Sequence, residues 1–239
     1  MKTLLSALLA GSVGIAFGQD GFPITTDRPS FSDGTLIVPK GRWQIEAGYS
    51  FNSVAGSKLE TFGELLLRYP LSDAAEFRLS NLTFVRGKIV DPILGVKLKV
   101  PNKSLDLAVI LQTTVPAGDE AFRVDRAQPT AKLAFYKQAD PTTGWGGNLV
   151  VSDLGEDVGR FTQYAASLYL SKTLSPKTGA FAEVYRLMPI ADGGPDANFI
   201  DAGVTYLLNP NTQIDFRIGT GLDQKRDGWF FGFGIAYRF

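Results

Sequence analysis

The chain offers few side chains with catalytic potential, because it contains no histidine and no cysteine. Histidine is the usual general base of enzymes and the commonest metal ligand, and cysteine supplies thiolates and disulfides. A serine hydrolase with a histidine base and a thiolate metal site are therefore excluded. Serine, lysine and carboxylates form no alternative catalytic constellation. We expect no enzymatic activity, no cofactor and no metal site.

Charged residues recur at a spacing that carries structural meaning. They alternate with apolar residues, and side chains alternate across a β-strand, so the charges share one face. Lys plus Arg and Asp plus Glu are equal at 24 each, which gives no excess of positive charge for nucleic acid. The charged candidates on this face are Glu46, Glu60, Glu64, Arg68, Arg78, Lys97, Lys99, Glu183, Asp201, Asp215, Arg217 and Arg238.

Two interpretations of this charged face stay open. The basic members gather towards one end of the expected strands and most acidic members lie in the middle, which would filter solutes by charge. Alternatively, the charges form ion-paired ladders across neighbouring strands and stiffen the wall.

The last segment, 228–239, shows the opposite face most clearly. Large apolar residues occupy its odd positions, from Trp229 and Phe231 to Phe239, whereas its even positions are mostly small or charged. A soluble protein would need a second layer to cover such a face, but a bilayer covers it in a membrane barrel.

Similar alternation recurs along the chain and predicts a transmembrane, antiparallel, up-and-down β-barrel. About twelve strands are expected, with ten as the alternative, and even numbers are typical of bacterial barrels. Short turns should lie at the periplasmic end and longer loops at the opposite end, with aromatic belts near both. The expected strands are 43–51, 59–69, 75–86, 91–100, 104–115, 125–137, 144–153, 161–173, 178–188, 198–208, 211–221 and 228–239.

The N-terminal 40 residues do not join this alternation. Residues 1–18 have the positive start, apolar stretch and small-x-small end of a cleaved export signal. Residues 19–40 are either a periplasmic tether or a plug inserted into the lumen, with Asp27 and Arg28 as plug residues. The barrel then comprises residues 41–239.

Several motifs resemble those of a family of outer-membrane transporters described as "MetA-pathway of phenol degradation". They are Thr26-Asp27-Arg28-Pro29, Phe31-Ser32-Asp33-Gly34 and the stretch from Pro39 to Tyr49. The resemblance spans essentially the whole chain after the export signal and implies a barrel that transports small molecules, with aromatic or hydrophobic molecules as the candidates. Tyr237 and Phe239 resemble the aromatic C-terminal signal that barrel-assembly machinery recognises.

The sequence therefore predicts a bacterial outer-membrane channel for passive uptake or efflux of small molecules. Its expected partners are outer-membrane lipid, lipopolysaccharide and the barrel-assembly machinery. Inward rings would either line an apolar path for aromatic cargo or simply fill the lumen. The alternative function is a non-conducting structural or partner-binding barrel. The inward rings considered are Phe62, Phe84, Tyr136 and Tyr169.

Overall fold

The structure, a computed structural model, describes residues 23–54, 57–155, 159–223 and 228–239. The export signal expected at residues 1–18 lies outside this part of the chain. Within it there is no helix that is long and apolar enough to cross a membrane.

The described chain consists of twelve long strands and one two-residue strand, β4. The long strands match the segments expected from the alternation, with ends that differ by a few residues. Their bounds are β1 Gln44–Val54, β2 Ser57–Ser72, β3 Ala75–Val85, β5 Ile93–Val100, β6 Asp106–Thr114, β7 Pro129–Asp140, β8 Thr143–Leu154, β9 Phe161–Ser175, β10 Thr178–Met188, β11 Ala197–Asn209, β12 Thr212–Gly221 and β13 Trp229–Arg238, and β4 is Lys88–Ile89.

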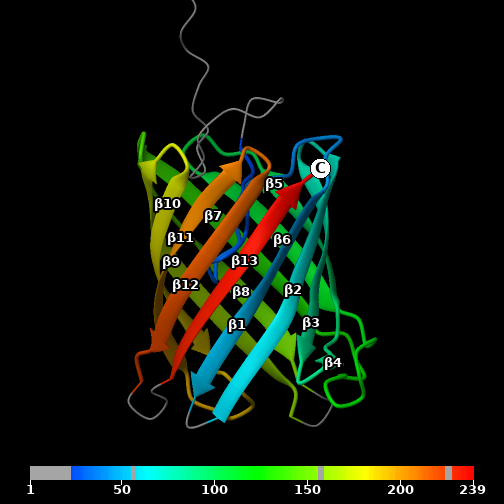
Figure 1. Ribbon diagram of the computed structural model, residues 1–239. Coiled ribbons are helices and arrows are strands. Elements are labelled where there is room, and N and C mark those ends of the chain that lie inside the picture. The colour runs from blue at the N-terminus through cyan, green and yellow to red at the C-terminus, as the bar shows by residue number, and fades with distance from the viewer. Residues whose placement is uncertain (1–22, 55–56, 156–158, 224–227) are drawn as a thin grey trace, which may run out of the picture.

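The strands form one closed antiparallel barrel (Figure 1). Long strands that follow one another in the chain are neighbours in the sheet, and β13 returns to β1. The closing ladder runs from Gln44 opposite Arg238 to Ser53 opposite Trp229. The predicted up-and-down barrel of about twelve strands is confirmed.

The two ends of the barrel differ in their connections. At the end where the C-terminus lies, the strands are joined by short turns such as 141–142, 176–177 and 210–211. At the opposite end lie longer connections, including 115–128 and 189–196. Residues 23–40 enter from the short-turn end and run inside the barrel (Figure 1), except that Pro39 and Lys40 are exposed at the rim.

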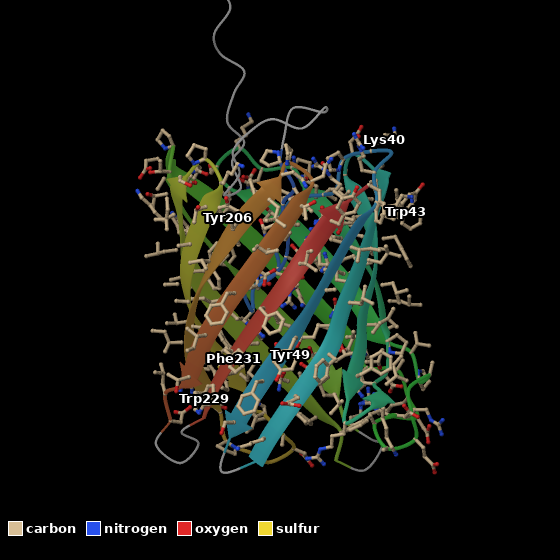
Figure 2. The ribbon with its side chains drawn as sticks, in the orientation of Figure 1. Lys40, Trp43, Tyr49, Tyr206, Trp229 and Phe231 are labelled. Carbon is tan, nitrogen blue, oxygen red and sulfur yellow. The ribbon has the colours of Figure 1, made fainter. Side chains whose placement is uncertain are left out.

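The alternation places apolar side chains outside and polar side chains inside. On β13, Trp229, Phe233 and Tyr237 are exposed, whereas Phe230, Ala236 and Arg238 are buried. Figure 2 shows Tyr49, Phe231 and Trp229 on the outer surface over β1 and β13. Most of the buried side chains carry polar or charged groups, so this barrel has a polar interior and an apolar exterior, as membrane barrels do.

A bulge overturns the expected orientation of residues at the long-loop end of β2. The register with β1 shifts at Gly63 and Glu64, whose φ angles are 91° and 39°. One extra residue exchanges the two faces of a strand. Glu60, expected in the lumen, therefore lies outside, where the Tyr49 hydroxyl donates to it at 3.1 Å.

The same effect corrects the expectation for two aromatic rings. Phe62 lies just before the bulge in β2, and its ring packs on the outward ring of Tyr49 at 4.8 Å. On β3, Asn81 has a φ of 61°, and Phe84 beyond it is 47% exposed. Phe62 and Phe84 thus belong to the outer surface. The glycine at position 63 is the sequence signal that could have indicated the bulge.

Candidate functional site

The candidate site is the lumen around residues 23–40, which we call the inserted segment. Its base is held at the short-turn end, where the Ile24 amide donates to the Pro210 carbonyl at 2.8 Å. Ile24 also packs in a small apolar cluster with Leu207 and Ala236. The segment thus starts from a fixed point among otherwise polar surroundings.

Asp27 is the centre of an ion cluster between the inserted segment and the wall. Its carboxylate lies 2.9 Å from Lys97 Nζ, 2.5 Å from Arg78 Nη1 and 3.9 Å from Arg68 Nη1. Burial alone would raise the pKa of the Asp27 carboxyl, but Arg68, Lys97 and Arg78 hold that pKa well below its usual range. Asp27 is therefore ionised and shared by three cations of the wall.

Asp33 forms a second ionic anchor near the first. Its carboxylate lies 2.8 Å from Arg78 Nη2 and 2.5 Å from Lys132 Nζ. The backbone amide of Asp33 donates to the Asn148 side chain at 2.8 Å. Asp33 and Asn148 are not among the site residues expected from the sequence.

At Arg28 the signs are reversed: the cation belongs to the inserted segment and its partner carboxylates belong to the wall. Its guanidinium lies 2.7 Å from Glu64 and 3.6 Å from Asp215. It lies flat across Gly48 and Gly234, which face each other on β1 and β13. A Cβ at Gly48 would come within 2.1 Å of Arg28 Nη2, so the bare backbone makes room for this arginine.

Wall carboxylates also bind the backbone of the inserted segment. Glu46 accepts the amides of Asp27 and Arg28, each at 3.0 Å. Glu183, on the far side of the barrel, accepts the amides of Phe31 at 2.7 Å and Ser32 at 3.0 Å. These contacts satisfy amides that would otherwise be unpaired inside the barrel.

Ion pairs also connect neighbouring strands directly. Arg68 on β2 lies 3.0 Å from Glu46 on β1 and 2.9 Å from Glu76 on β3. These are pairs of the kind proposed in the ladder interpretation. The inserted segment adds its own charges to these pairs. The charges of β1–β3 and β5 are therefore paired partly with neighbouring strands and partly with the inserted segment.

Beside the inserted segment, towards β7–β12, there is a cavity of about 130 Å³. Its wall side is formed by rings and hydroxyls, including Tyr136, Tyr169, Phe181, Ser171 and Thr205. Among the described residues that line it, the charged ones are Asp27, Arg28 and Arg68, which come from the inserted segment and β2. The β7–β12 side of this cavity is therefore neutral.

Two glycines let the tyrosines lie flat against this side. A Cβ at Gly144 would come within 2.0 Å of the Tyr136 hydroxyl oxygen, and one at Gly146 within 2.7 Å of that of Tyr169. The two rings are nearly parallel, with centroids 6.4 Å apart. Both rings line this side of the cavity.

The remaining charged candidates do not join the cluster around Asp27. Asp201 lies directly across the ladder from Glu183, and its carboxylate makes no hydrogen bond within the described chain. Arg217 places its guanidinium 5.4 Å above the Phe230 ring. Arg238 bonds the Asn211 side chain, and Lys99 is exposed, both at the short-turn end.

Tyr237 and Phe239 lie on the outer surface at the C-terminal end of the barrel. Their rings meet edge to face at 4.8 Å. Both are exposed, so they are available for contacts from outside the barrel.

Comparisons with known proteins agree with this architecture. A model of the family described as "Putative MetA-pathway of phenol degradation" matches residues 26–239. A comparison with curated protein sequences gives no match.

Two solved structures share the fold at low sequence identity. The COG4313 outer membrane channel from Pseudomonas putida F1 has a TM-score of 0.63 and 14% identity, over 86% of this chain and 98% of that chain. The KdgM porin in complex with disordered oligogalacturonate has a TM-score of 0.55 and 9% identity, over 81% of this chain and 98% of that chain. At these identities the similarity concerns the fold alone.

Proposed function

We propose that this chain, which belongs to the family described as "Putative MetA-pathway of phenol degradation", is an outer-membrane channel for passive passage of small molecules. The observation that carries the proposal is the cavity left between the inserted segment and β7–β12, inside a barrel whose outer face is apolar. A polar lumen enclosed by an apolar exterior is the arrangement of membrane channels.

The proposed location is the bacterial outer membrane, with the short turns in the periplasm. Residues 1–18 would direct export, and Tyr237 and Phe239 would be recognised by the barrel-assembly machinery. The apolar outer face would contact lipid and lipopolysaccharide. The fold shared with outer-membrane barrels supports this location.

Solutes would pass through the cavity, whose β7–β12 lining is neutral. Towards β1–β5 the inserted segment is bonded to the wall through Asp27 and Arg28. On the other side, Tyr136, Tyr169 and Phe181 present aromatic faces to the cavity. Cavities of roughly 150 Å³ accommodate benzene, so the cargo we propose is a molecule with a single ring, and aromatic rings suit these faces best.

The inserted segment would limit conduction as a plug. The test is the conductance of the refolded protein in planar bilayers, for residues 19–239 and for residues 41–239. We expect a small ohmic current from the first and a larger one from the second, because removal of the segment widens the lumen. Heat-modifiable gel mobility and β-sheet circular dichroism would verify that both forms are folded.

Silence from both folded forms would contradict the channel proposal. It would favour the alternative, a non-conducting barrel with a structural or partner-binding role.

A further inference from the structure

The tip of the inserted segment carries an aromatic ring that occupies a defined position on the wall. Phe31 stacks on Tyr185 of β10 with a centroid distance of 4.3 Å and an interplanar angle of 2°. The other face of Tyr185 stacks on Phe199 of β11 at 4.8 Å and 13°. Three parallel rings thus form one stack, of which only Phe31 belongs to the inserted segment.

The other contacts of the tip are hydrogen bonds, and the Ser32 hydroxyl also donates to the Glu183 carboxylate. Glu183 accepts the amides of Phe31 and Ser32, and the Ser32 hydroxyl lies 2.6 Å from that of Ser167. By contrast, the strong ionic contacts of the segment are made by Asp27, Arg28 and Asp33. Loss of the ring contact would therefore loosen the tip and leave the ionic anchors in place.

We infer that the face of Tyr185 covered by Phe31 is a binding site for a flat aromatic ring, and that an aromatic solute opens the lumen by taking the place of Phe31. The inference rests on the channel function proposed above. Phe31, Tyr185 and Phe199 are all partly accessible rather than fully buried, so the stack can be reached from the lumen.

The chemistry of the stack selects for planarity. Aromatic pairs gain from parallel arrangement beyond the apolar area that they bury, and a saturated ring of the same size does not present a π-face. The solute competes with a tethered ring, whose effective concentration is on the order of millimolar. Displacement thus requires solute concentrations on the order of millimolar as well.

The experiment compares benzyl alcohol with cyclohexylmethanol on the full mature chain in planar bilayers. The two alcohols are similar in size, and only the first has an aromatic ring. Benzyl alcohol should raise the current to roughly half-way between that of the wild type and that of Phe31→Leu, since solute and tethered ring then compete at similar concentrations. Cyclohexylmethanol should leave the current unchanged.

Variants of the stack test its role directly. Tyr185→Phe retains the ring and should retain the response, whereas Tyr185→Leu should abolish it. Phe31→Leu, which keeps apolar volume without a flat ring, should conduct more at rest and should not respond. Equal responses to both alcohols, or a response that survives in Tyr185→Leu, would overturn the inference.

A second measurement does not depend on conduction. The chain has no cysteine, so Ser30→Cys provides a single thiol beside the tip. Benzyl alcohol should accelerate its modification by a charged maleimide, and cyclohexylmethanol should not. Unchanged labelling in a chain that conducts would refute displacement of the tip and leave the channel proposal standing. Silence of both 19–239 and 41–239 would refute the channel and with it the opening of the lumen, and the labelling would still decide whether an aromatic ring displaces Phe31.

Discussion

The two sides of the lumen treat the inserted segment differently. On the side of β1–β5, buried charges of the wall bind it, with Arg78 and Lys97 meeting Asp27 and Glu64 meeting Arg28. On the side of β7–β12, the Tyr136 and Tyr169 rings border a cavity next to it. The second side also contacts the segment, through Lys132, Glu183 and Tyr185, but it leaves a cavity next to it.

The difference has a physical cause. A charge taken out of water requires a partner with good geometry, and breaking such a pair by removing one partner typically costs about 3–5 kcal/mol. Stacked rings carry no such requirement, and hydroxyls need only a neutral hydrogen-bond partner, so a neutral wall can border a cavity. Ion pairs therefore make the strongest contacts of the segment, and the neutral lining of the cavity leaves room beside it.

The largest effect is expected from loss of the central carboxylate. Asp27→Ala leaves Lys97 and Arg78 buried without this partner and should lower the free energy of unfolding by about 3 kcal/mol. Urea titration of the refolded protein measures it, with the exposed Asp73→Ala as control. Equal urea midpoints for the two variants would mean that the ionic side does not hold the segment.

A smaller loss of stability is expected at Gly48, where the Arg28 guanidinium packs against a glycine. Gly48→Ala places a methyl group where the guanidinium lies, so the Arg28–Glu64 ion pair should be lost. The free energy of unfolding should fall by about 1–2 kcal/mol. The outward Ala47→Val is the matched control. In an Arg28→Ala background, Gly48→Ala should change little, because its effect acts through that side chain. Additive effects of the two substitutions would contradict this account.

The neutral side should respond in conduction more than in stability. Gly144→Ala pushes the Tyr136 ring away from the wall, which narrows the cavity, so the single-channel current should fall. The free energy of unfolding should fall by only about 1 kcal/mol. Adding Tyr136→Ala should restore the current. If Gly144→Ala leaves the current unchanged in a folded channel, the path does not follow this side.

The smallest expected effect is a difference in ion selectivity between charge reversals at two acidic residues of β2. Glu64 faces the lumen and Glu60 faces outward. Glu64→Lys should therefore shift the reversal potential in a salt gradient towards anion preference, and Glu60→Lys should not. Identical reversal potentials for the two variants would show that lumen charge does not filter ions.

Much of the barrel is readable from local pattern. The alternation in β13 predicts both its extent and its two faces, because period two links residue type directly to orientation in a strand. The same reasoning correctly orients Arg68 on β2 and Tyr136 on β7. It fails at Glu60 and Phe62, where one extra residue at Gly63–Glu64 exchanges the faces.

The sequence by itself therefore determined the barrel, its polar interior and the apolar surface around it, since these follow from short-range periodicity. Only the tertiary structure decided which charges meet. Asp27 is 70 residues from Lys97, and Phe31 is far along the chain from the Tyr185 on which it stacks. No local pattern encodes such contacts, because they depend on how the closed barrel brings distant strands around one inserted segment.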